Sequence, residues 1–346
     1  MRIAAASALS LSLSLALACG GAQGEDQGED ESEGHSAGTV DEGGASEGES
    51  AEAGGTDTLG ESGSEDSGEA TETGETGETG EAEPTCNCHV ELCERPYDEV
   101  VFAGTHNSYS ATGEGYIAVA ANQTYGVAQQ LADGVRLLML DTVYADDDSG
   151  AILLCHGSCN FGSTVHAEVL ADIVSFMTEN PGEIVTIIYE DDVSAEDLAL
   201  DFAATGAIDL VYTHVGGEPW PTLAEMVAAD TRLVITAEQG GPPPDWHHHV
   251  WDLAWDTPYG PMDPDALSCA LNRGSSDNDL FLVNHWVNSP FGTPSVDNAT
   301  IVNEYDVLLE RAQACWAAWE HPTNFVAVDF YDRGDLIAVV DTLNGF

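Results

Sequence analysis

The chain has 346 residues, with 62 Asp and Glu against 7 Lys and Arg, and a formal net charge of −55 at pH 7. All seven basic residues are arginines, so no cluster of cations is available to neutralise nucleic-acid phosphates or to dock on an anionic membrane. Nucleic acid is therefore excluded as a partner. Residues 86–346 are enough for one large core or an α/β barrel.

Residues 1–18 predict a signal peptide. Arg2 supplies one positive charge, and an uncharged run of apolar and small residues follows it, too short for a comfortable membrane span. The run ends at Cys19, and small residues before a cysteine resemble a bacterial lipobox. We therefore expect an exported protein that is lipid-anchored through Cys19 to a bacterial membrane, at the outer membrane or cell surface. The alternative is an ordinary secretory cleavage site beside a cysteine that carries no lipid.

Residues 19–85 predict a disordered acidic tether. From residue 20 onward the segment is rich in Gly, Glu, Ser, Thr, Asp and Ala, with Val40 and Leu59 as its large aliphatic residues. Such a segment cannot bury enough apolar surface to offset the entropy lost on ordering. We expect a flexible, self-repelling spacer with no specific partner, followed by one folded domain over residues 86–346.

Seven cysteines lie beyond Cys19, and export makes disulfides their default state. Spacing does not determine the pairing; Cys269 with Cys315 and a bridge within residues 86–93 are the pairs that we expect. Zinc bound at residues 86–89 or 155–159 is the competing interpretation, which the spacings and the compartment disfavour.

Apolar, β-rich runs alternate with helical patterns through the predicted domain. We expect strands at 100–106, 136–144, 151–156, 184–190, 232–238, 280–286 and 325–332, and helices at 116–131, 163–179, 221–229, 302–319 and 334–343. This alternation implies a mostly parallel sheet, and the length with roughly eight strands favours a closed but irregular TIM-type (β/α)8 barrel over an open doubly wound sheet. We expect a monomer.

Polar residues gather at the carboxyl ends of these strands, where a barrel of this kind carries its functional groups. They are His106, Asn107, Asp141, His156, Glu190, His285 and Asp329. Their shared position predicts a single site at one end of the barrel.

Three strings in chain order carry a family resemblance. They are Gly104-Thr105-His106-Asn107-Ser108-Tyr109, Gly134-Val135-Arg136 leading to Asp141-Thr142, and Leu154-Cys155-His156-Gly157, followed by the strand at 184–191 and a last strand that contains Asp329. Together they resemble the X domain of phosphatidylinositol-specific phospholipase C and the wider PLC-like phosphodiesterase superfamily, over residues 95–345. The resemblance implies a phosphoric diester hydrolase or lyase.

The resemblance also implies a mechanism. Family members cleave a phosphodiester by attack of the inositol 2-hydroxyl on phosphorus, which expels diacylglycerol and leaves a cyclic inositol phosphate. One group must accept the hydroxyl proton and another must protonate the leaving oxygen, and two histidines can do this near neutral pH. By resemblance, His106 is the general base, His156 the general acid, and Asp329 the carboxylate that orients an imidazole.

Calcium is the cofactor that the resemblance implies. Asn107, Asp141 and Glu190 are oxygen ligands at positions where family members bind Ca²⁺, which would meet the negative charge that develops on the phosphoryl oxygens. Met139 stands where eukaryotic members carry a further carboxylate, so one ligand is missing. The alternative is that these acids form an ordinary rim of an acidic protein.

The substrate is expected to be a phospholipid or another inositol phosphodiester. Phosphorylated inositides usually need several cations around the head group. Residues 86–346 contain only six arginines and no lysine, which favours plain phosphatidylinositol or an analogue with an uncharged head group. Arg136, His285 and Tyr331 are the candidate substrate-binding residues, although Arg136 could equally form a structural salt bridge and Tyr331 could simply line the barrel.

Two other functions remain open at this point. One is a non-cyclising phosphodiesterase on the same barrel, which usually has His-Arg-Gly in its first strand, a string that is absent here. The other is a non-catalytic lipid- or glycan-binding surface lipoprotein, which would have no need for an acid and a base.

Overall fold

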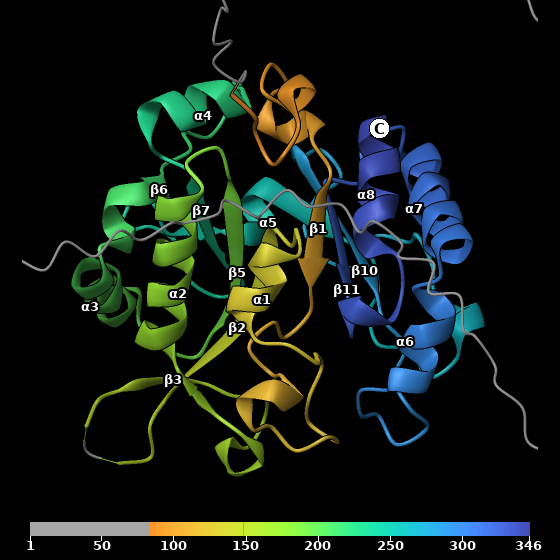
Figure 1. Cartoon of the computed structure of the whole chain (residues 1–346), viewed down its shortest axis with the longest axis horizontal. Helices are drawn as coiled ribbons and strands as arrows, with labels where there is room; N and C mark the ends of the chain where they lie inside the picture. Colours follow the sequence, from red (N-terminus) through yellow and green to blue (C-terminus); the bar gives the residue numbers. More distant parts are fainter. Residues whose placement is uncertain (1–83, 148) are drawn as a thin grey trace, which may run out of the picture. The chain divides into compact units, whose positions relative to one another are not determined.

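The computed structural model describes residues 84–147 and 149–346 (Figure 1). The predicted signal peptide, Cys19 and the tether up to residue 83 lie outside the described residues. No helix in the described part of the chain is long and apolar enough to cross a membrane.

One row of parallel strands organises the domain. In hydrogen-bonded order it runs β6-β7-β5-β2-β1-β11-β10-β9. The strands of this row are β1 (Phe102–Thr105), β2 (Leu137–Tyr144), β5 (Val185–Asp191), β6 (Val211–Tyr212), β7 (Leu233–Ala237), β9 (Ala254–Asp256), β10 (Leu280–His285) and β11 (Phe325–Val328). The predicted TIM-type α/β fold is confirmed, but the row is open, because its end strands β6 and β9 do not pair with each other.

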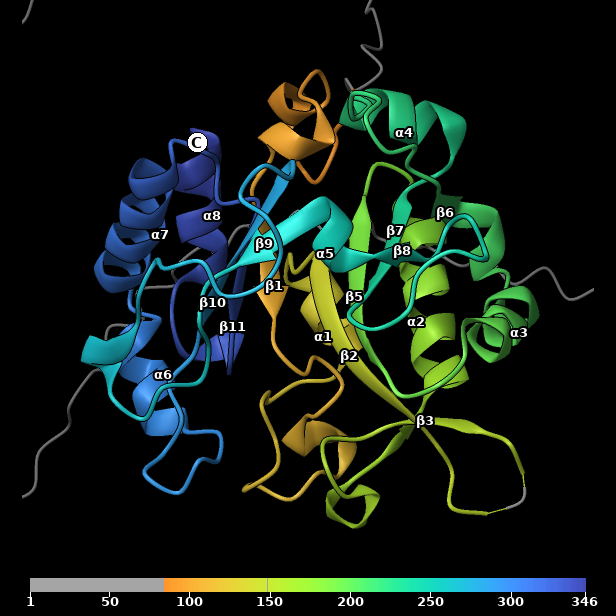
Figure 2. The same cartoon turned by 180° about the vertical axis from the view of Figure 1, so that it is seen from behind.

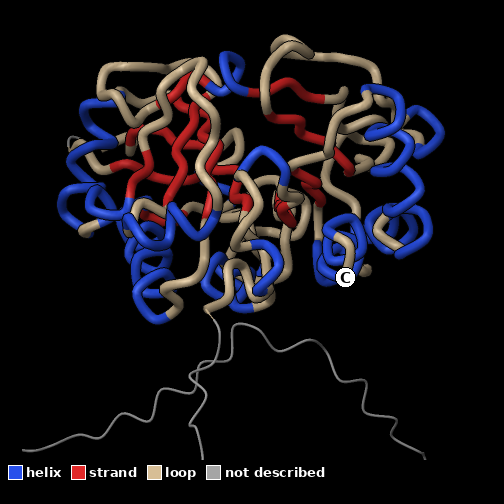
Figure 3. Tube along the Cα trace, turned by 90° about the horizontal axis from the view of Figure 1, so that it is seen from above, coloured by secondary structure: helices blue, strands red, loops and turns tan. Residues whose placement is uncertain are grey.

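Helices cover the outer side of the curved row of strands (Figures 1 and 3). The helices of the described residues are α1 (Val127–Ala132), α2 (His166–Glu179), α3 (Ala195–Thr205), α4 (Leu223–Ala229), α5 (Val250–Leu253), α6 (Val296–Val302), α7 (Tyr305–Trp319) and α8 (Leu336–Asn344). Figure 2 shows the other side, where β9 and α5 lie.

Alternation along the strands places most of the buried apolar residues in two large clusters. In β2, Leu138 and Leu140 pack in the cluster that includes Leu131 of α1 and Ile173 of α2, whereas Leu137 packs on the opposite face. Side chains of successive strand residues point to opposite faces of a sheet, so a strand that is buried on both sides reads as a continuous apolar run.

Two predicted elements differ from the structure, one in its pairing and one in its extent. The run at 151–156 is not a barrel strand: β3 (Ile152–Leu154) pairs antiparallel with β2 and then with β4 (Thr164–Val165), forming a hairpin extension. The predicted helix at 116–131 is reduced to α1, because the chain first turns back and Gln123 bonds through its backbone N–H to the carbonyl of Ser110.

Three disulfides join described cysteines: Cys86–Cys93, Cys155–Cys159 and Cys269–Cys315. The expected bridge within residues 86–93 and the expected Cys269–Cys315 pair are both formed. The Cys86–Cys93 and Cys155–Cys159 bonds occupy thiols that the zinc interpretation requires.

Candidate active site

His106 follows β1 directly and is held from two sides. Its Nδ1 lies 2.8 Å from Oδ1 of Asp329, which follows β11, the neighbouring strand. The indole of Trp286 stacks on the imidazole at 3.9 Å between ring centroids. Asn122 donates to both oxygens of Asp329 at 3.0 and 3.1 Å. This carboxylate is only 3% exposed, so the contacts fix the orientation of His106, whose Nε2 lies 3.3 Å from the oxygen of Asn107 when that amide turns its nitrogen toward Asp141.

His156 reaches the same place from the hairpin extension. It follows β3, and the Cys155–Cys159 disulfide closes a short loop that contains it. Its Nδ1 lies 3.1 Å from Oδ2 of Asp141 and 2.9 Å from the amide of Asn107. With its nitrogen toward Asp141, that amide donates to Oδ1 of the carboxylate at 3.0 Å. The hydrogen bond with Asp141 raises the pKa of His156, which burial only partly opposes.

The two imidazoles lie close together, and His106 lines a cavity whose other walls are described below. Their ring centroids are 6.4 Å apart and the ring planes are nearly perpendicular, at 81°. His106 is 18% exposed and His156 is 48% exposed, so neither ring is sealed in the interior. Two groups that can transfer protons, each bonded to a carboxylate, are therefore close neighbours in the structure.

Carboxylates line the cavity beside the histidines. Asp141 and Glu190 are directly paired residues on the neighbouring strands β2 and β5. Burial raises the pKa of Glu190, and the nearby charge of Asp141 raises it further. Asn107, Asp141 and Glu190 all line the cavity, so they are the residues that could supply oxygen ligands to a hard cation. Met139 lines the same cavity and contributes no oxygen.

The opposite wall contains an arginine that the strand-end analysis did not single out. Arg273 donates to Oδ2 of Asp256 at 2.7 Å and to Oε2 of Glu238 at 2.7 Å, and its guanidinium lies 4.9 Å from the ring centroid of Tyr259. Burial raises the pKa of Glu238 to about 7, although the charge of Arg273 opposes the shift. Glu238, Arg273 and Tyr259 line the cavity of about 260 Å³ that also contains His106.

The three predicted substrate-binding residues, Arg136, Tyr331 and His285, do not line this cavity. Arg136 precedes β2 at its amino end, is 3% exposed, and donates to Glu183 at 2.7 Å, so it forms a structural salt bridge. The hydroxyl of Tyr331 donates to Asp133 at 2.6 Å in the helix-covered core.

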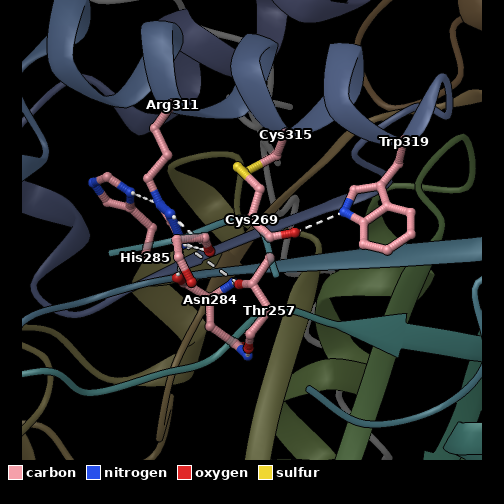
Figure 4. The surroundings of a disulfide bond; sticks show 8 residues. Thr257, Cys269, Asn284, His285, Arg311, Cys315 and Trp319 are labelled. Atoms are coloured by element: carbon pink, nitrogen blue, oxygen red, sulfur yellow. Dashed lines mark hydrogen bonds between the residues drawn. A yellow bond between two sulfur atoms is a disulfide. The ribbon is translucent and has the colours of Figure 1, made fainter. Parts of the chain in front are cut away.

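His285 is also excluded from the cavity. It is fully buried; its Nε2 lies 2.8 Å from the carbonyl of Val302, and its Nδ1 accepts from Arg311 at 3.1 Å (Figure 4). Burial lowers the pKa of His285 to about 3, and the charge of Arg311 lowers it further. This histidine is therefore a neutral structural group.

Similarity to known proteins shows the family to which the chain belongs. The family model described as PI-PLC X 1 matches residues 92–344. An "Uncharacterized secreted protein" of Arthroderma benhamiae is 28% identical over 282 residues, which cover 72% of this chain and 61% of the relative. The "PI-PLC X domain-containing protein 1" of the same organism is 28% identical over 283 residues, covering 75% of this chain and 89% of the relative.

A PI-PLC X domain-containing protein of Arabidopsis thaliana is 30% identical over 277 residues, covering 72% of this chain and 63% of the relative. The chain thus spans less than two thirds of two of these three relatives. Among solved structures, phosphatidylinositol-specific phospholipase C of Staphylococcus aureus matches with a TM-score of 0.53 at 16% identity, covering 73% of this chain and 95% of that chain. This likeness shows a shared fold, and the match of residues 92–344 shows that the chain belongs to the PI-PLC X family.

Proposed function

We propose that the protein is a phosphodiesterase that cleaves phosphatidylinositol, or a related glycerophosphoinositol diester, by attack of the inositol 2-hydroxyl on phosphorus. The observation that carries the proposal is the pair His106 and His156, with ring centroids 6.4 Å apart and a carboxylate bonded to each ring. A module that only binds lipid or glycan has no use for this arrangement.

His106 is the general base in this proposal. Its Nδ1–H donates to Asp329, which leaves the lone pair of Nε2 to accept the proton of the 2-hydroxyl as the oxygen attacks. The carboxylate then stabilises the imidazolium that forms. Stacking on Trp286 prevents the ring from rotating out of this position.

His156 is the general acid. Since the hydrogen bond with Asp141 raises its pKa, a larger fraction of the imidazole is protonated near neutral pH than in an ordinary histidine. Nδ1–H remains on Asp141, and Nε2–H donates its proton to the diacylglycerol oxygen as the bond to phosphorus breaks. The products are an inositol cyclic phosphate and diacylglycerol.

The opposite wall provides the head-group subsite. Arg273 supplies N–H donors, Glu238 supplies acceptor oxygens, and Tyr259 supplies an aromatic face, which together match the hydroxyls and the apolar face of a polyol ring. The single arginine is already paired with two carboxylates, so it offers little attraction to a phosphorylated ring. The subsite therefore favours an unphosphorylated head group.

Calcium is the cofactor that we propose, held by Asn107, Asp141 and Glu190. When bound, it would supply electrostatic stabilisation of the phosphoryl oxygens. We expect EDTA to lower kcat/KM by roughly tenfold or more, and added Ca²⁺ to restore it. Activity that is unchanged in EDTA would contradict the calcium proposal and leave the roles of the histidines intact.

The cellular setting is proposed from the disulfides. Three bonds between described cysteines fit an oxidising compartment, and a relative described as secreted supports export. We propose an exported protein anchored by a lipid on Cys19. Mass spectrometry of the mature amino terminus tests this, because an unmodified terminus would contradict the anchor.

Phosphorus NMR of phosphatidylinositol in detergent micelles tests the reaction itself. The wild-type protein should produce an inositol cyclic phosphate, and His156→Ala should produce none over the same period. Inositol 1-phosphate as the first product would instead indicate a non-cyclising phosphodiesterase. No product from the wild-type protein, with or without Ca²⁺, would favour the non-catalytic alternative.

A further inference from the structure

The segment between β9 and Arg273 carries part of the pocket wall but has little structure of its own. We call residues 258–272 the β9–β10 loop. A single 3-10 turn at Pro264–Ala266 is its regular element, and every residue of the loop is exposed or half-buried. Such a segment buries too little apolar surface to hold its own position. Tyr259 at its start and Arg273 at its end nevertheless line the cavity.

The two ends of the loop are tied together at the barrel. The backbone N–H of Arg273 donates to Oδ1 of Asp256 at 2.8 Å, and the N–H of Asp256 donates to the carbonyl of Arg273 at 3.1 Å. Gly274 follows with a φ of 79°, and a Cβ there would lie 2.1 Å from the carbonyl oxygen of Ala254. The chain thus crosses β9 in a contact that only glycine permits.

The distal part of the loop is tied to one helix. Arg311, Cys315 and Trp319 are spaced four residues apart on α7, so they lie on one face of the helix (Figure 4). Cys315 forms a disulfide with Cys269 of the loop. The indole Nε1 of Trp319 donates to the carbonyl of Cys269 at 2.7 Å. We call these three α7 residues the α7 clamp.

Arg311 extends the clamp from the loop to the barrel. Its guanidinium donates to the carbonyl of Ser268 at 3.3 Å and to the carbonyl of Asn284 at 2.9 Å. Burial lowers the pKa of Arg311 to about 10, and no carboxylate lies within ion-pair distance of it in the described part of the chain. The N–H groups of the Arg311 guanidinium are therefore used in hydrogen bonds to neutral carbonyls, and these bonds connect the loop to the barrel. Asn284 in turn donates to Oδ2 of Asp256, which accepts from Arg273.

We propose that the α7 clamp positions the β9–β10 loop, and through it Tyr259 and Arg273, for binding of the substrate head group. The expected effect on substrate binding rests on the proposed function, whereas the positioning of the loop does not. The clamp residues do not line the cavity, so they act through the loop and are positioning residues. Breaking the clamp should weaken head-group binding and leave the histidine pair unchanged.

Limited proteolysis tests the clamp without reference to activity. Trypsin cleaves after arginine, and the chain has 7 arginines and no lysine, so cleavage between Arg273 and Gly274 gives a fragment that is easily assigned. In the Cys269→Ser/Cys315→Ser double variant of the full chain, we expect this cleavage to become about tenfold faster. The matched control is Cys86→Ser/Cys93→Ser, which removes a disulfide formed outside the loop and the α7 clamp.

Steady-state kinetics on phosphatidylinositol in mixed micelles give the second measurement. The clamp variant should raise KM, and the inhibition constant for free myo-inositol, by about tenfold with kcat within about twofold of wild type. Unchanged protection of Arg273, or a fall in kcat at constant KM, would overturn the proposal.

If the double variant does not fold, Trp319→Phe removes the hydrogen bond to Cys269 and keeps the disulfide, and smaller shifts of the same sign are expected. If the wild-type protein does not turn over phosphatidylinositol, the proposed function fails, and the trypsin result still decides the clamp.

Discussion

The two histidines have different surroundings, and the difference separates their roles. His106 is mostly buried, stacked on Trp286 and bonded to a carboxylate that is 3% exposed. His156 is half exposed on a hairpin and bonded to Asp141, which raises its pKa. In the proposed mechanism, the rigidly oriented ring accepts the proton of the bound hydroxyl, and the more exposed ring with the raised pKa protonates the leaving group.

Asp329→Asn tests the orienting carboxylate. An amide nitrogen facing Nδ1 of His106 would favour the tautomer with its proton on Nε2, which removes the base. We expect kcat to fall by about 10²-fold or more, with unfolding stability changed much less than activity. Tyr331→Phe is the matched control on the same segment, because it removes only the bond to Asp133. Equal kcat values for the two variants would contradict the role of Asp329.

Asp141→Asn tests the assignment of His156 as the acid. The native pKa of His156 is raised, so the protonated form persists to higher pH, and kcat/KM should fall on the alkaline side as pH rises through that pKa. Removing the carboxylate removes the main cause of the shift, so the alkaline limb should move to lower pH. A full pH profile of kcat/KM measures this. An alkaline limb that stays in place would assign the acid to another group.

The motif residues at the strand ends lie near one another in the structure, and their catalytic roles stay a prediction. His106, His156 and Asp329 come together in the structure as the family strings imply. Arg136 and Tyr331 belong to the same strings but serve the core, because a pattern of letters does not say which way a side chain points. Arg136 lies at the amino end of its strand, whereas the site lies at the carboxyl ends. This position in the sequence could have indicated that Arg136 does not reach the site.

At the level of elements, the pocket depends on a hairpin and a loop whose sequences show no periodic pattern of apolar residues. His156 stands on a hairpin whose β3 strand was predicted as part of the barrel, and Arg273 follows an irregular loop. Continuous apolar runs predicted the central strands correctly, since a strand that is buried on both faces carries apolar residues at nearly every position. Strands of two or three residues, such as β6 and β9, are fixed by tertiary pairing and carry too few residues for a pattern.

Gly274→Ala tests the crossing of β9 by the chain. Gly274 and Gly217 have nearly the same left-handed φ, 79° and 82°, but a Cβ would strike the Ala254 carbonyl only at Gly274, while at Gly217 it would meet nothing within 4 Å. Gly217→Ala should therefore lower the free energy of unfolding by about 1 kcal/mol for backbone conformation alone. Gly274→Ala should cost at least about 2 kcal/mol more, because the backbone must shift. Denaturant unfolding measures both, and equal losses would show that the close contact is absent.

At the scale of the whole molecule, charge sets the conditions for activity. Residues 86–346 hold 41 acidic residues against 6 arginines, and the acids of the cavity belong to this excess. A protein of this charge is repelled from a surface that contains anionic phosphatidylinositol. The fold and the pocket do not remove this repulsion, because the single arginine in the pocket lining is paired with carboxylates.

Salt should therefore stimulate activity at a charged surface. Raising NaCl from about 10 mM to about 150 mM shortens the Debye length from roughly 30 Å to roughly 8 Å, which screens the repulsion between the protein and the vesicle. We expect kcat/KM on vesicles of phosphatidylinositol in phosphatidylglycerol to rise several-fold over this range. Vesicles that contain the same phosphatidylinositol in phosphatidylcholine are the control, and their smaller surface charge predicts a smaller rise. Activity that falls with salt on both vesicles would mean that attraction, through a bound cation or a patch outside the described residues, dominates the encounter.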